Sequence, residues 1–498
     1  MRALLVTSIG VACAGALLLL PLTPTESADS TLPGDRSAPA EDAAPPAARD
    51  VRAESGTGVP GSTQSLPLGA PSDSTRSGDK LLSAWEDDPS GGRRVASRKV
   101  KPFSLVGVVW EDAGAEPRGQ LQVQTRASGS GRWSSWRSLD THGGHSPEAG
   151  SKGRSGERAL GSTAPLWAGN SDAVRVRIVP HKTPTRTTGQ SNGQEQGNAE
   201  LPGGARLELV DPGPGTPSGG AGGREQREGG DPEPGAGQAS GQTSGQASGG
   251  AADEAAGSHE QRPGGVLPAM TKAQTRATYG DEAADATSSR SDRPQDTHIG
   301  PRPDIVTRKG WGADESMREK EFSYSKSIKA AFVHHSAETN DYTCGQVPSI
   351  IRGIYRYHVK SSRWRDLGYN FLVDKCGKIY EGRAGGMARA VMGAHTFGFN
   401  ADTTGIAVLG TYSKETAPKA VTEALAKLTA WKLGVHGVDA RGKVTLTSGG
   451  GTKHKKGTKV SFNAVSGHRD GFVTECPGEK LYSELPAIRN DAGRLQGR

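Results

Sequence analysis

The stretch Lys329-Ala-Ala-Phe-Val-His-His335 decides the fold of the C-terminal half of this 498-residue chain. Four consecutive apolar residues predict a buried strand, and the two histidines place polar side chains at its end. Around this strand we expect helices over 347–358 and 416–433, hairpins over 368–380 and 443–462, and a strand over 406–409. Alternating helices and strands predict an α/β domain over residues 301–490.

Upstream, short apolar runs separated by Gly-, Pro- and Ser-rich turns predict strands only. The runs are residues 103–110, 120–126, 173–179 and 205–210. This pattern predicts an all-β sandwich domain over residues 96–212. Trp133 and Trp136 follow one of its turns, either as a carbohydrate-binding platform or, more commonly for tryptophan in a small sandwich, as packed core residues.

The other segments have a composition that is typical of disorder. Only 33% of all residues are hydrophobic, whereas 71 are Gly and 31 are Pro. Long stretches therefore cannot bury enough apolar surface to offset the entropy of ordering. We expect a disordered spacer over 28–95 and a disordered Gly/Ser/Gln-rich linker over 213–300. Such a linker would let one domain hold a surface while the other works nearby.

The N-terminus has the pattern of an export signal. Arg2 precedes an apolar run over residues 3–20, and Pro21 and Pro24 interrupt the run before small residues suited to cleavage. A membrane-spanning anchor is the alternative, because the run approaches the roughly 20 residues that a span requires. The single arginine and the prolines favour a signal peptide over residues 1–27, a secreted chain, and no transmembrane segment after cleavage.

The formal net charge of +7 suits an anionic partner. For an exported protein this indicates an anionic cell-wall or membrane surface. Nucleic acid is not expected as a partner, because no basic helix or interleaved aromatic platform is present.

Removal of the signal peptide leaves three cysteines, Cys344, Cys376 and Cys476. Oxidising conditions favour pairing, so an odd count leaves one thiol over. That thiol is buried and inert, pairs with another chain, or binds a metal.

Three residues have the chemistry of a catalytic zinc site. His334 ends the strand quoted above, and Cys476 follows His468 by eight residues. Two imidazoles and a thiolate would fill three positions of a tetrahedral zinc site and leave the fourth for water. Each histidine alone is more often a core residue than a ligand, so spacing leaves both interpretations open.

Several motifs resemble the peptidoglycan recognition proteins and type-2 N-acetylmuramoyl-L-alanine amidases, which share the fold of phage T7 lysozyme. They are Phe332-Val-His-His-Ser336, Asp366-Leu-Gly-Tyr-Asn-Phe-Leu-Val373, Ile379-Tyr-Glu-Gly-Arg383, Gly393-Ala-His395, Gly467-His-Arg-Asp470 and Cys476-Pro-Gly478. The resemblance covers residues 302–488 and implies a mixed central β-sheet flanked by helices. It also implies that Zn²⁺ is held by His334, His468 and Cys476, with His335 as a structural or substrate-side neighbour.

The resemblance assigns roles to further residues. Tyr369 matches the family's catalytic tyrosine, for which a buried structural tyrosine is the alternative. Thr474 stands where the phage enzyme has a lysine and animal amidases have threonine; it donates to the developing oxyanion or caps its loop. Cys344 and Cys376 match a family disulfide.

Four residues lie at positions that the family uses along its peptide and glycan groove: Trp364, Arg383, His395 and Asn400. Arginine would suit a stem-peptide carboxylate. After Arg383 the chain has Ala384-Gly385-Gly386, where relatives that recognise diaminopimelic acid have Gly-Trp, so the preferred stem residue stays open.

The resemblance therefore implies a secreted, monomeric zinc amidase that cuts the bond between N-acetylmuramic acid and L-alanine in peptidoglycan. Family members that only bind peptidoglycan lack the cysteine, so Cys476 favours an enzyme. The alternatives are a non-catalytic peptidoglycan sensor and a wall-attached adhesion protein whose β-domain does the work.

Overall fold

The computed structural model describes residues 61–68, 85–87, 93–141, 156–180, 199–214, 265–285 and 298–498. The expected signal peptide, residues 1–27, lies outside this part of the chain. None of the described helices has the length and apolar character needed to cross a membrane.

Among the described residues, the named elements of the N-terminal domain are strands, as predicted. They are β1 (Ser62–Pro67), β2 (Trp85–Asp87), β3 (Arg93–Trp110), β4 (Gln120–Ala127), β5 (Arg137–Ser138), β6 (Gly161–Ser162), β7 (Leu166–Val179) and β8 (Arg206–Asp211). Hydrogen bonds join them in the order β1-β8-β3-β7-β4-β5, with β2 and β6 paired to β3. Inward residues such as Phe103, Val106, Leu121 and Val176 form the core.

The predicted spacer over 28–95 is wrong where β1 and β2 lie. β1 pairs with β8 along its whole length, from Ser62–Asp211 to Pro67–Arg206. Its sequence, Ser-Thr-Gln-Ser-Leu-Pro, has little apolar content. The strand is stabilised by backbone hydrogen bonds to β8, which lies more than 130 residues away in sequence. Hydrophobic periodicity cannot predict such a distant pairing.

The C-terminal domain is built on a mixed sheet, which confirms the expected α/β fold. Its strands are β9 (Val266–Leu267), β10 (Ile305–Val306), β11 (Ala330–His335), β12 (Phe371–Val373), β13 (Ile379–Glu381), β14 (Thr403–Val408) and β17 (Val465–Gly467), in the order β17-β11-β14-β12-β13-β10-β9. β11 pairs in parallel with β14 and β17, whereas β12 and β13 form the predicted antiparallel hairpin.

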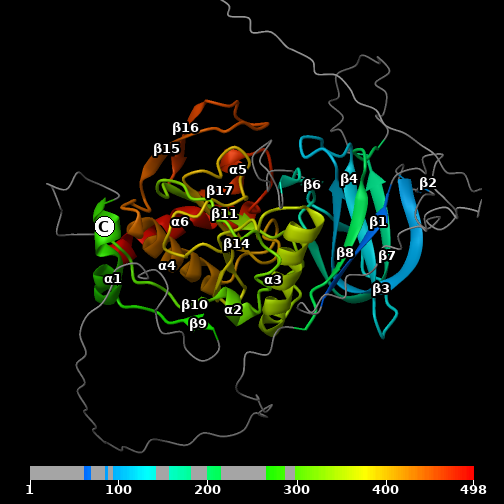
Figure 1. Ribbon diagram of the computed structural model, residues 1–498, viewed down its shortest axis with the longest axis horizontal. Helices are drawn as coiled ribbons and strands as arrows, with labels where there is room; N and C mark the ends of the chain where they lie inside the picture. The colour runs from blue at the N-terminus through cyan, green and yellow to red at the C-terminus, as the bar shows by residue number, and fades with distance from the viewer. Residues whose placement is uncertain are drawn as a thin grey trace, which may run out of the picture. The chain divides into compact units, whose positions relative to one another are not determined.

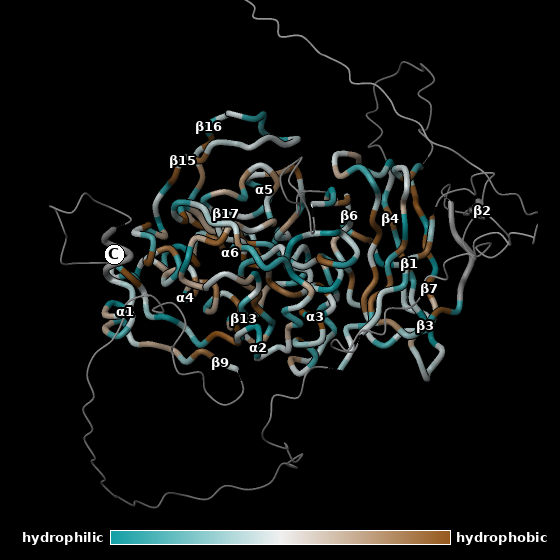
Figure 2. The backbone as a smooth tube through the Cα atoms, viewed as in Figure 1, coloured by the Kyte–Doolittle hydropathy of each residue, from teal (hydrophilic) through white to brown (hydrophobic). Residues whose placement is uncertain are grey.

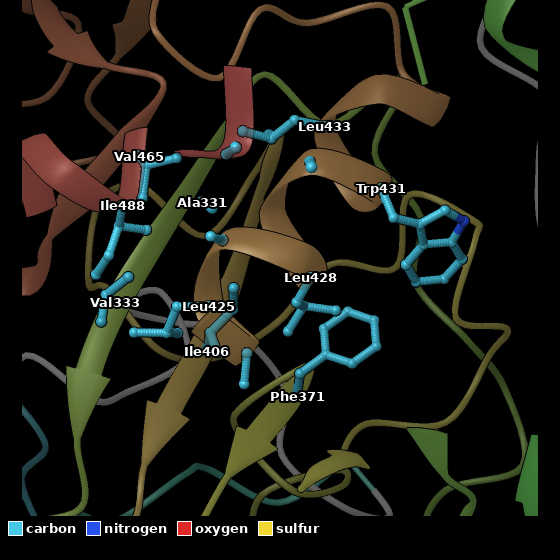
Figure 3. Close-up of a cluster of buried hydrophobic side chains, with 14 of the residues drawn as sticks. Ala331, Val333, Phe371, Ile406, Leu425, Leu428, Trp431, Leu433, Val465 and Ile488 are labelled. Atoms are coloured by element: carbon cyan, nitrogen blue, oxygen red, sulfur yellow. The ribbon is translucent and has the colours of Figure 1, made fainter. Parts of the chain in front are cut away.

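Helices cover this sheet (Figure 1). They are α1 (Lys272–Asp285), α2 (Arg308–Trp311), η2 (Cys344–Gln346), α3 (Val347–Arg356), the π-helical turn η3 (Tyr357–Ser361), α4 (Lys419–Val435), α5 (His468–Gly471) and α6 (Glu479–Gln496). Figure 3 shows Leu425, Leu428 and Trp431 of α4 close to strand residues Phe371 and Ile406.

The two faces of the sheet follow the strand period of two residues. Phe371 and Ile406 belong to the core under α4, and the next residues, Leu372 and Ala407, belong to the core under α3. A sheet buried on both faces explains the continuous apolar runs that predicted it.

The predicted linker over 213–300 is wrong at its C-terminal end, because β9 and α1 lie there. The sequence of α1 has no apolar stripe that would predict a helix. The helix is attached through single contacts: the Tyr279 ring packs edge-on against Trp431, and Thr275 Oγ1 accepts from the Arg302 amide at 3.0 Å.

A second hairpin pairs β15 (Lys443–Thr447) with β16 (Lys459–Asn463), as predicted, and it projects from the domain in Figure 1. The expected disulfide between Cys344 and Cys376 is also confirmed; it joins η2 to the turn between β12 and β13.

The β-domain and the α/β domain share one hydrophobic cluster. Leu105, Trp167 and Val210 pack with Ile350 and Ile354 of α3. The two domains therefore pack against each other.

Candidate metal centre

The candidate site lies where neighbouring parallel strands end. β11 ends in His334 and His335, and β17, its parallel neighbour, runs directly into α5 at His468. The carboxyl ends of parallel strands lie at the same edge of a sheet, so this register brings the two histidines together. The loop after α5 then folds back, with the Arg469 amide donating to the Cys476 carbonyl at 2.9 Å.

Side-chain donor atoms of His334, His468 and Cys476 all lie within 4.8 Å of one another. His334 Nδ1 is 3.8 Å from Cys476 Sγ, and the two imidazole rings are 4.5 Å apart between centroids. All three side chains are fully buried. Of the three cysteines that the structure describes, Cys344 and Cys376 are bonded to each other, and Cys476 is a free thiol.

This donor set fits zinc. Two imidazoles and one thiolate match the borderline-soft preference of Zn²⁺, and three protein ligands leave one position open. Burial raises the pKa of the Cys476 thiol well above its ordinary value, and the backbone hydrogen bond to His335 opposes that rise. A coordinated cation favours the thiolate and would offset the cost of burying it.

His335 supports the site through its backbone. Its amide donates to Cys476 Sγ at 3.4 Å. Its own ring lies outside the three-residue cluster, and burial lowers the pKa of His335 to about 4, so the ring is neutral at physiological pH. The geometry therefore places the side chain of His334 in the cluster and the ring of His335 outside it. In the sequence, only the family resemblance distinguishes these two neighbouring histidines.

A chain of hydrogen bonds favours one tautomer of His334. The Phe399 carbonyl can only accept, so the Thr403 hydroxyl, 2.5 Å away, donates to it. Thr403 Oγ1 then accepts from His395 Nε2–H at 3.3 Å. In a neutral His395 ring this leaves Nδ1 as an acceptor, which lies 3.3 Å from His334 Nε2 and 3.1 Å from the Thr396 hydroxyl. When His334 donates from Nε2, its Nδ1, the nitrogen that faces Cys476, keeps its lone pair for a metal.

The two candidate catalytic residues lie beside the cluster. The Tyr369 ring centroid is 5.5 Å from that of His334, and burial raises the pKa of Tyr369 well above its usual value. Its phenol therefore stays protonated. Thr474 Oγ1 accepts from the Cys476 amide at 3.1 Å, which is the loop-capping role. The same hydroxyl still has a hydrogen to donate.

The four candidate substrate residues are engaged within the protein. Trp364 is 1% exposed and stacks on His358 at 4.3 Å. Asn400 Oδ1 accepts from the amides of His395 and Thr396. Arg383 donates to the carbonyls of Leu367, Met392 and Asp366 at 2.7, 3.1 and 3.4 Å. His395, as described above, holds His334.

Asp140 of the β-domain is a charged group whose influence on the site sequence reasoning missed. Its negative charge adds to the effect of burial in raising the pKa of Tyr369 and Cys476, and it opposes the lowering of the His335 pKa by burial. No sequence signal could have found it, because Asp140 lies in another domain and in no motif.

Comparisons with known proteins identify the family of the C-terminal domain. Residues 324–479 match the family described as N-acetylmuramoyl-L-alanine amidase, and residues 50–199 match the family described as Rv3811 N-terminal galactose-binding domain-like. Peptidoglycan-recognition protein SC2 of Drosophila simulans is 30% identical over 186 residues, which are 37% of this chain and 86% of that protein.

Two further relatives have similar coverage. A peptidoglycan recognition protein of Bombyx mori is 28% identical over 38% of this chain and 83% of its own length. The solved structure of wild-type Drosophila PGRP-LB is 26% identical, with a TM-score of 0.29, and the match covers 36% of this chain and 91% of that one.

Proposed function

Because the chain belongs to the family of peptidoglycan recognition proteins and type-2 amidases, we propose that it is a secreted zinc hydrolase that cleaves peptidoglycan between N-acetylmuramic acid and L-alanine. One observation carries the catalytic part of the proposal. Cys476 is a buried free thiol whose Sγ lies with His334 and His468 in a cluster suited to Zn²⁺.

The ligands would be His334 through Nδ1, His468, and Cys476 as thiolate. When bound, Zn²⁺ polarises the scissile carbonyl and makes hydroxide available at neutral pH. The chain's own residues keep the donors in position. His395 holds the ring of His334, and the amide of His335 holds Cys476 Sγ.

Two hydroxyl groups next to the ligands can donate hydrogen bonds to the reacting groups. The Tyr369 phenol remains protonated, so its Oη can donate a hydrogen bond to the developing oxyanion or orient the attacking water. Thr474 accepts from the Cys476 amide and can donate its remaining hydrogen towards the same oxyanion. The substrate is the glycan–peptide junction, and the protein works as a monomer at the wall.

The test is a digest of purified peptidoglycan by the full mature chain, by its Cys476→Ala variant, and by wild type with a chelator. We expect the wild type to release a free lactyl group on muramic acid and a free L-alanine amine. Chelation should abolish that release until Zn²⁺ is restored, and the variant should show no release.

A parallel binding measurement separates the enzyme from a sensor. The Cys476→Ala variant should still bind peptidoglycan, because it lacks only a metal ligand. A wild-type chain that binds peptidoglycan yet releases neither product with Zn²⁺ present would be a recognition protein, and the amidase proposal would be wrong.

A further inference from the structure

The hairpin of β15 and β16 concentrates positive charge. Residues 441–469 contain seven Lys and Arg residues and no Asp or Glu: Arg441, Lys443, Lys453, Lys455, Lys456, Lys459 and Arg469. Over the rest of the chain, Lys and Arg equal Asp and Glu in number, since the whole chain has 61 of the former and 54 of the latter. The net charge of +7 therefore equals the charge of this one segment.

The hairpin has one apolar and one charged side. Leu446 and Phe462 are buried and pack against Phe332 and Phe399. The alternate positions face solvent, and Lys443 and Lys459 are exposed there. Figure 2 shows teal and white along the outer part of the hairpin. Lys455 and Lys456 at the tip are exposed as well.

The lysines have no acidic partner among the described residues. Arg441 and Arg469 form ion pairs with flanking carboxylates, Asp439 for the first and Glu475 and Glu479 for the second. None of the five lysines appears in an ion pair within the part of the chain that the structure describes. Their charge is available to an external anion.

The hairpin is attached next to the candidate metal centre. Lys453 Nζ donates to the carbonyl of Arg469, the residue after ligand His468. The amide of Gly449 donates to the Gly398 carbonyl at 2.7 Å, and the His454 ring packs edge-on against Phe399 at 5.7 Å. A polymer held on the hairpin would therefore lie close to the bond-cleaving residues.

We propose that the exposed lysines of this hairpin dock the protein on a wall polymer that carries repeated phosphate groups. Lysine ammonium groups act as compact point charges and bind phosphate without a fixed fork geometry. The large aromatic side chain of the hairpin, Phe462, is buried, so the surface offers no stacking platform for neutral sugars or bases. The proposal rests on the proposed function only for the location at the wall.

The experiment uses the full mature chain with Cys476→Ala, so that cleavage cannot alter the wall. The hairpin variant adds Lys443→Gln, Lys455→Gln, Lys456→Gln and Lys459→Gln. A control of equal charge change adds Lys326→Gln, Lys414→Gln, Lys427→Gln and Lys480→Gln, which are exposed positions outside the hairpin. Co-sedimentation is measured with intact walls, with walls stripped of phosphodiester polymer by hydrofluoric acid, and with phosphatidylglycerol vesicles.

We expect the hairpin variant to bind intact walls at least about tenfold more weakly than its parent at low ionic strength. The control should bind nearly as its parent does. The difference should disappear on stripped walls, and also near 1 M salt, where the Debye length is only about 3 Å. Equal thermal unfolding of both variants would show that the hairpin stays folded.

Three results would overturn the proposal: equal weakening of both variants, the same loss on stripped walls, or a loss confined to the vesicles. The second would indicate carboxylates of peptidoglycan, and the third an anionic membrane. Because the measurement uses an inactive parent, it is independent of whether the wild type cleaves peptidoglycan.

Discussion

His395 contacts the ring of His334, one of the three proposed zinc ligands. Its Nδ1 lies 3.3 Å from Nε2 of His334, and its own Nε2–H is held by Thr403. We expect His395→Gln to weaken Zn²⁺ binding about 10–100-fold, as loss of such outer partners of ligating histidines typically does. The dissociation constant is measured by competition with a chelating dye.

Thr403→Val is the matched variant for this prediction, because it keeps His395 but removes the hydroxyl that fixes its tautomer. It should weaken Zn²⁺ binding in the same direction by a smaller factor. If both variants bind Zn²⁺ within a factor of two of the wild type while unfolding at the same temperature, the hydrogen-bond chain does not orient the ligand.

Single residues also show how far the sequence alone could lead. The odd cysteine count and the eight-residue distance from His468 single out Cys476, and the structure places both residues near His334. Roles for His395 and Asn400 could not be derived, because they depend on three-dimensional contacts between loops. A motif marks such residues as important, but it does not show whether they contact a substrate or a metal-binding side chain.

Among the elements, the disulfide links the start of the α3 segment to the β12–β13 turn. Cys344 and Cys376 are separated by 32 residues. In the chain-entropy account, closing such a loop stabilises the fold by about 3–4 kcal/mol. Replacing both cysteines by alanine should lower the free energy of unfolding by about that amount, as measured by urea denaturation.

Thiol counting provides the control for that prediction. The denatured mature wild type should contain one titratable thiol, Cys476, and the double alanine variant should also contain one. Unchanged stability of the double variant would mean that the bridge constrains the unfolded chain less than its loop length implies.

Elements with their own hydrophobic pattern were predictable, and those stabilised by distant contacts were not. α3 and the β15–β16 hairpin lie where periodicity placed them. α1 and β1 fell in segments predicted to be disordered, because one depends on Tyr279 against Trp431 and the other on pairing with β8. Tertiary contacts overrode weak local signals in both cases.

At the scale of the whole molecule, the β-domain and the α/β domain pack against each other. Besides the shared cluster of Leu105 and Ile350, Ser361 donates to Glu208 Oε2 at 2.9 Å. Burial raises the pKa of this Glu208 carboxyl. Deleting the β-domain would therefore expose an apolar face, so loss of activity in such a truncation does not by itself assign binding to the β-domain.

A substitution at Tyr357 tests whether the contact between the β-domain and the α/β domain stabilises the protein. Its buried hydroxyl lies 3.0 Å from the Val108 carbonyl and 3.2 Å from the Thr163 carbonyl, both in the β-domain. Tyr357→Phe removes the donor. The Val108 carbonyl still accepts from the Thr163 amide at 2.9 Å, but the buried Thr163 carbonyl loses its hydrogen bond to the phenol, which costs about 1–3 kcal/mol. In the control Tyr324→Phe, the hydroxyl also bonds a carbonyl, that of Gly385, but the side chain is exposed and water can replace it.

Calorimetry should show one unfolding transition for both domains. Its temperature should be lowered by Tyr357→Phe and almost unchanged by Tyr324→Phe. Two separate transitions, with Tyr357→Phe shifting neither, would mean that the domains are independent.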